Sequence, residues 1–167
     1  EISSLKVLPM IYTRFIFLRL LRSLYYFGLR REKTIQENFE FLISQCSLDD
    51  YSPIIATRFL SLIYNCCKKN EPLLFHDFIT INNTSEAMPD ISWISENYIN
   101  SICNSLLLMQ NVREYNSIID SKIIKVRFEC CPPWEVNPKN WTPENDYFLF
   151  MTVNDIGFSS LVHFFID

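Results

Sequence analysis

Glycine is nearly missing from this chain: only Gly28 and Gly157 occur among 167 residues, where average usage of about 7% would supply roughly a dozen. Loops that cradle phosphate need several closely spaced glycines, because backbone N–H groups must approach the anion. Neither the G-x-G-x-x-G pattern nor the P-loop pattern is present. This absence excludes the common nucleotide-binding folds, and we expect no cofactor.

Histidine is also scarce, since His76 and His163 are the two imidazoles of the chain. Neither lies in a metal-ligand or nucleophile motif, and a metal site of the phosphohydrolase type needs further histidines and aspartates. The most suggestive thiol site is Cys130-Cys131, which we interpret as small hydrophobic residues at the end of a strand. We therefore predict no catalytic and no metal-binding residue, and keep a small hydrolase-like enzyme with a Cys or carboxylate site as the second alternative.

The residues that are present favour one folded domain over the whole chain, 1–167. Apolar residues make up 49% of the sequence and charged residues 20%, a composition rich enough in core formers to exclude general disorder. The six cysteines include two adjacent pairs, at 66–67 and 130–131, which suit disulfides poorly because neighbouring side chains point apart. We expect free thiols and an intracellular location, in the cytoplasm or nucleus.

Charge is distributed unevenly along the chain. Residues 1–33 hold seven basic and two acidic side chains, net +5, whereas residues 34–167 hold eight basic and seventeen acidic ones, net −9. Four interpretations arise: a basic helix resting on an acidic body, an acidic protein partner, nucleic acid, or an anionic membrane surface. Nucleic acid is not expected as a partner, because a chain of pI about 5.2 repels phosphates.

The arginines of the first segment are candidate partner-binding residues. At 100° per residue Arg14, Arg19 and Arg22 fall within about 140° of arc, which predicts an amphipathic helix with Phe15 and Leu18 facing elsewhere. The same arginines interrupt every 18-residue window, which argues against a membrane span.

Three further helices are predicted after this first one. Thr34 and Glu37 form a capping box for a helix that ends near Cys46. Ser52-Pro53 starts the next helix, and residues 92–112 show the spacing of a fourth.

The residue pattern in the last third of the chain predicts strands. Residues 118–130 alternate apolar and charged side chains, and residues 147–153 and 161–166 are further strand candidates; earlier in the chain, residues 73–81 fit a short strand or irregular packing equally well. The predicted fold class is α+β, in which N-terminal antiparallel helices (about 1–116) pack on a small C-terminal antiparallel sheet (about 117–167). A mostly α, helical-repeat-like fold is the alternative.

A proline-rich loop at 131–143 is the second candidate surface. Pro133, Trp134 and Trp141 offer large, stiff contact area, although the tryptophans serve equally well to cap a sheet edge. We predict a non-enzymatic protein–protein interaction subunit, an adaptor or scaffold of a larger eukaryotic or viral intracellular complex. The first alternative is a membrane-surface-associated protein that uses its basic N-terminal helix. Because the sequence begins at Glu1 rather than at methionine, we expect a processed product or a piece of a longer protein.

Overall fold

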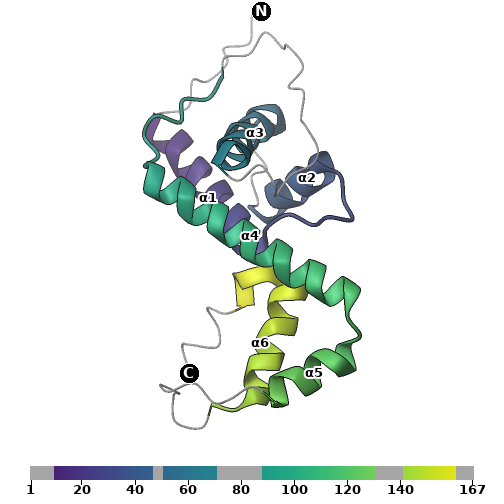
Figure 1. The fold of residues 1–167 in the computed structure, drawn as a ribbon. Helices are drawn as coiled ribbons and strands as arrows, with labels where there is room; N and C mark the ends of the chain where they lie inside the picture. The colour runs from purple at the N-terminus through teal and green to yellow at the C-terminus, as the bar shows by residue number, and fades with distance from the viewer. Residues whose placement is uncertain (1–9, 47–50, 71–87, 131–140, 161–167) are drawn as a thin grey trace, which may run out of the picture.

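A computed structural model describes residues 10–46, 51–70, 88–130 and 141–160, and every regular element within these ranges is helical (Figure 1). The helices are α1 (Met10–Phe27), α2 (Ile35–Gln45), α3 (Pro53–Asn70), α4 (Glu96–Ile118), α5 (Ser121–Glu129), α6 (Pro143–Ile156) and the short 3₁₀ helix η2 (Gly157–Ser160). No strand occurs in these ranges, so the predicted α+β fold with its C-terminal sheet is wrong, and the mostly helical alternative is right.

The alternating segment predicted as a strand forms α5 instead. The Asp120 carboxylate caps this helix by accepting a bond from the Lys122 backbone N–H at 2.8 Å. Helical spacing turns Ile124 inward, while Ile123 and Val126 remain 50% and 54% exposed. An apolar run this short fits both the two-residue repeat of a strand and the 3.6-residue repeat of a helix. Packing on α6 selected the helix.

The strand predicted at 147–153 lies inside α6. Thr142 and Asn145 cap each other's backbone N–H groups in a capping box, and Pro143 occupies the first turn. Thr142 and Pro143 fall within residues 131–143, predicted as a proline-rich loop, of which 131–140 lie outside the described residues. The strands predicted at 73–81 and 161–166 also lie outside them.

The predictions for the helical half agree better with the structure. The capping box between Thr34 and Glu37 is present at the start of α2, and α3 begins at Pro53 as predicted. The fourth helix begins later than predicted, because Ser95 is its cap, and it continues to Ile118. Each of these starts depends on local hydrogen bonds between neighbouring residues, which a sequence pattern can predict.

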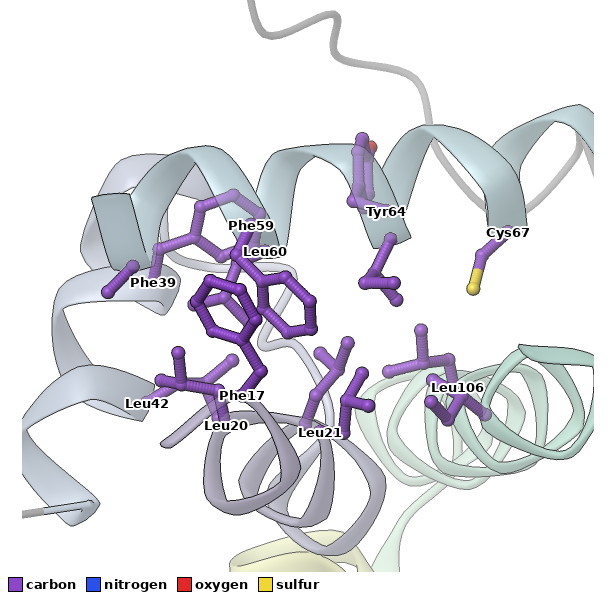
Figure 2. Packing of buried hydrophobic residues seen from close by; sticks show 14 of the residues in the cluster. Phe17, Leu20, Leu21, Phe39, Leu42, Phe59, Leu60, Tyr64, Cys67 and Leu106 are labelled. Carbon is purple, nitrogen blue, oxygen red and sulfur yellow. The ribbon is translucent and has the colours of Figure 1, made fainter. Parts of the chain in front are cut away.

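The main hydrophobic core lies between the first four helices (Figure 2). Phe17 of α1 stacks on Phe59 of α3 with ring centroids 4.0 Å apart. The inward side of α1 is essentially inaccessible to solvent, and its members are Ile16, Phe17, Leu20, Leu21 and Leu24. Because each such side chain contributes about 1.5 to 3 kcal/mol when buried, α1 is an integral part of the fold.

The long helix α4 connects this core to a smaller C-terminal lobe, which we define as the last turns of α4 together with α5 and α6 (Figure 1). The Arg113 guanidinium of α4 donates to the carbonyl oxygens of Phe27 (2.9 Å), Leu29 (2.8 Å) and Asn154 (3.1 Å). It thereby joins the C-terminal ends of α1 and α6. Ser105 connects α4 to α1 a second time, because its hydroxyl donates a hydrogen bond to the Tyr25 carbonyl at 2.7 Å.

Candidate functional site

The side of α1 that faces away from the core combines positive charge with apolar surface. We call this set the α1 outer face; it consists of Arg14, Phe15, Leu18, Arg19 and Arg22. Phe15 is 56% exposed and Leu18 is 39% exposed. Helical geometry places Leu18 between Arg14 and Arg22, and Phe15 between Arg22 and Arg19.

The expectation that Phe15 and Leu18 face away from the arginines is therefore wrong. The inward side of α1 is already filled by the five buried residues of the core, so no angular space is left there for Phe15 or Leu18. The three arginines do share one side of the helix, as predicted. Arg14 and Arg22 are exposed, and Arg19 is half-buried.

Within the described ranges, none of these arginines forms an ion pair with a carboxylate; the two ion pairs there are Arg30–Glu32 and Arg31–Glu114. The Arg14 guanidinium instead lies over the Trp93 ring, 5.7 Å from its centroid. Trp93 is held in turn by a bond from its Nε1 to the Asp90 carbonyl at 2.9 Å. The arginines of the α1 outer face thus make no direct ion pair within the described ranges. Asp90 is the nearby carboxylate: hydrogen bonds from Ser92 lower its pKa, and the charge of Arg14 lowers the pKa further.

The proline-tryptophan candidates fall partly outside the structure. Pro133 and Trp134 lie outside the described residues, while Trp141 stands directly before the first turn of α6. Its Nε1 donates to the Asp146 carboxylate at 2.8 Å, and its side chain is half-buried. This bond ties Trp141 to its own helix, which is the contact expected of a residue that helps to hold the start of α6 in place.

An apolar hollow of about 510 Å³ opens between the three helices of the C-terminal lobe. Its lining residues are Asn111, Val112, Tyr115, Ile124, Arg127, Phe128 and Phe150. Phe150 packs against Phe128 with ring centroids 5.5 Å apart and meets Tyr115 edge to face at 5.9 Å. None of these residues was a predicted site residue, because two of the contributing segments were assigned to strands and a hollow between three helices has no local sequence signal.

The described residues assemble no metal centre, since no group of three or more His, Cys, Asp or Glu side chains among them lies close enough to hold an ion. His76, His163 and Cys131 lie outside the described ranges. Cys130 is exposed and carries a free thiol at the end of α5. The hydrolase-like alternative therefore gains no metal site from this part of the chain.

The described cysteines Cys46, Cys66, Cys67, Cys103 and Cys130 are free thiols, and they differ in accessibility. Burial raises the pKa of the Cys67 thiol, and its neighbour Cys103 raises the pKa further. Burial also raises the pKa of Cys46. Because the thiolate is the reactive form, a buried thiol of raised pKa should react slowly in the folded protein, whereas an exposed thiol should react readily.

We accordingly expect a maleimide to label Cys130 rapidly in the native protein and Cys67 at least about a hundredfold more slowly, since reaction there requires opening of the core. Mass measurement over time, with peptide mapping, follows each site. After unfolding without reductant all six cysteines of the sequence should be alkylated. Protected pairs under those conditions would contradict the free-thiol prediction and the intracellular assignment with it.

In the part of the chain that the structure describes, every regular element is helical and the first helix carries a cationic, apolar face. Searches for matches among protein-family models, curated proteins and solved structures found none. Among the described helices, none is long and apolar enough to cross a membrane.

Proposed function

We propose that this chain is a non-enzymatic protein–protein interaction domain, an adaptor or subunit of a larger intracellular complex, and that it binds an acidic amphipathic segment of a partner through the α1 outer face. The observation that carries the proposal is the exposure of Phe15 and Leu18 between three arginines, with no ion pair from those arginines in the described ranges. The free thiols of the five described cysteines support a reducing compartment.

The chemistry of this face fits a protein ligand. Arginine and aromatic residues are enriched at the energetic centres of interfaces, and a guanidinium binds carboxylates through two parallel bonds. Burial of Phe15 and Leu18 under a partner would contribute up to about 1.5 to 3 kcal/mol each. A helix that presents apolar residues at three-to-four spacing, flanked by Glu or Asp, matches both features.

The membrane-surface alternative loses support from the packing of α1. An interfacial helix inserts its apolar side into the lipid boundary, yet the apolar side of α1 is buried in the protein core. Among the α1 side chains that the structure describes, Phe15 and Leu18 are the exposed large hydrophobic residues, and two such side chains offer little area for insertion. Lipid binding through the buried apolar residues of α1 would require this helix to leave the core.

The test compares two variants of the α1 outer face with a matched control in quantitative affinity purification from the native cell. One variant carries Phe15→Ser with Leu18→Ser, and the other replaces the three arginines by glutamine. The control, Leu108→Ser with Lys69→Gln and Lys125→Gln, changes an exposed leucine and two exposed lysines elsewhere. All should keep the far-ultraviolet circular dichroism of the wild type.

We expect a partner that the control retains and that both α1 variants lose by about thirtyfold or more, which corresponds to the removal of an interface anchor worth about 2 kcal/mol. Binding of the purified partner should weaken with added salt because the arginines are exposed. The proposal is wrong if the α1 variants retain every partner of the wild type. Co-sedimentation of the wild type with anionic vesicles, lost in the same variants, would favour the membrane-surface alternative instead.

A further inference from the structure

The C-terminal lobe has few buried side chains and an open apolar hollow at its surface. On α5 and α6 only Ile124 and Val153 are buried, whereas the first four helices enclose a large cluster of buried side chains. The hollow beside Ile124 has a volume of about 510 Å³, within the range of about 300 to 1,000 Å³ found for small-molecule sites. A lobe of this kind gains stability from any ligand that fills it.

The walls of the hollow are largely hydrocarbon and are held in place by aromatic packing. Val112 and Ile124 contribute aliphatic surface, and Phe128 and Phe150 contribute rings. Contacts among the rings fix these walls, since Phe150 touches both Phe128 and Tyr115 and Phe128 also meets Tyr147. An apolar molecule can therefore enter without first ordering the side chains around it.

A single charged residue, Arg127, contributes to the lining. Its guanidinium lies near the Tyr115 ring, 5.8 Å from the centroid, and donates to the Tyr115 hydroxyl. No carboxylate in the described ranges forms an ion pair with it. Because a guanidinium has five N–H donors in a fork that matches a carboxylate, donors of Arg127 remain for an anion, and the Asn111 amide and the Tyr115 hydroxyl add neutral polar groups at the same hollow.

From this combination we propose that the hollow binds an amphipathic monoanion, a long-chain carboxylate whose head pairs with Arg127 and whose chain lies against Val112, Ile124, Phe128 and Phe150. The charge of the lining selects the anionic head, and the aromatic and aliphatic walls select the hydrocarbon chain. This site lies on different helices from the α1 outer face and does not depend on the proposed partner binding.

The experiment titrates the full chain with dodecanoate by calorimetry, and with dodecanol and dodecyltrimethylammonium for comparison. Methyl and aromatic NMR shifts locate the binding. Dodecanoate should bind with a Kd tighter than about 1 mM and shift the signals of Val112, Ile124 and Phe150. Dodecanol should bind at least about tenfold more weakly, and the cationic amphiphile more weakly still.

Arg127→Gln should reduce dodecanoate affinity at least about tenfold and leave dodecanol binding unchanged, while Lys125→Gln, an exposed cation on the same helix outside the lining, should change neither. Val112→Phe should fill part of the hollow and weaken both ligands; if it fails to fold, the exposed Arg127 variant still decides the question. The site is refuted by absence of dodecanoate binding, by equal binding of the three amphiphiles, by full affinity in Arg127→Gln, or by NMR shifts confined to residues outside the lobe.

Discussion

Replacing Gly157 with alanine should destabilise the protein by about 3 kcal/mol or more. The residue follows α6 with φ +69° and ψ −150°, a backbone region that is essentially restricted to glycine and that costs other residues about 1 to 3 kcal/mol. A Cβ built there would lie 2.2 Å from the Tyr26 carbonyl oxygen and 3.1 Å from the Phe27 Cα. Both obstacles are backbone atoms of the last turn of α1.

This turn cannot move aside easily, because Arg113 binds the Phe27 carbonyl and Ser105 binds the Tyr25 carbonyl. The steric cost of an added methyl group in tight packing, typically about 1 to 3 kcal/mol, therefore adds to the backbone cost. Urea unfolding monitored by circular dichroism measures the two costs together, as the loss in free energy of unfolding. The C-terminal lobe should also lose its fixed position relative to α1, since η2 packs against α1.

Gly28→Ala is the matched control. Gly28 also has a positive φ, +64°, but its added Cβ would meet the end of the Met109 side chain, at 2.7 Å from Cε. A methionine terminus can rotate away, so the loss should stay near the backbone contribution alone, about 1 to 2 kcal/mol. An equal or smaller loss for Gly157→Ala than for Gly28→Ala would contradict the packing described at the α1–α6 junction.

Removal of the Arg113 side chain is expected to have the second large effect, about 3 to 5 kcal/mol for Arg113→Met. Its three carbonyl acceptors lie at the C-terminal ends of α1 and α6, where the helix dipole favours a cation. Each hydrogen bond from a charged donor contributes about 1.5 to 3 kcal/mol to stability, and the substitution removes the bonds to all three carbonyl groups at once. Burial lowers the pKa of the guanidinium below its ordinary value, and Arg30 lowers the pKa further; an arginine still carries its charge at neutral pH.

Hydrogen exchange separates this effect from general destabilisation. If Arg113 joins the lobe to the core, Arg113→Met should increase exchange in α5 and α6 more than in α2 and α3. Arg113→Lys should recover only part of the loss, because one ammonium cannot reproduce the planar fork. Arg31→Met removes an exposed ion pair with Glu114 and should cost less than about 1 kcal/mol. A uniform rise in exchange over all helices would show that Arg113 acts as an ordinary core residue.

The candidate surfaces were predictable only in part. Charge counting identified Arg14, Arg19 and Arg22 as a group, and the structure places them on one side of α1. The same spacing of 100° per residue also places Phe15 and Leu18 within the arc of those arginines; the prediction missed this because it assigned the apolar residues of the segment to another side of the helix, whereas α1 carries more apolar residues than its inward side buries. The hollow of the C-terminal lobe could not be predicted at all, since its walls come from three helices that meet only after folding.

The sequence by itself determined where α2 and α3 begin, because the Thr34–Glu37 capping box binds backbone within a few residues of itself and Pro53 suits a first helical turn. It also determined that the chain would fold around a large apolar core and lack a glycine-rich phosphate loop. Tertiary structure decided that residues 121–129 and 147–153 are helical. Their apolar patterns are also compatible with one face of a strand. The helical conformation followed from the packing of α5 on α6 and of α6 on α4. This packing brings together residues far apart in the chain, so it leaves no signal in any single segment.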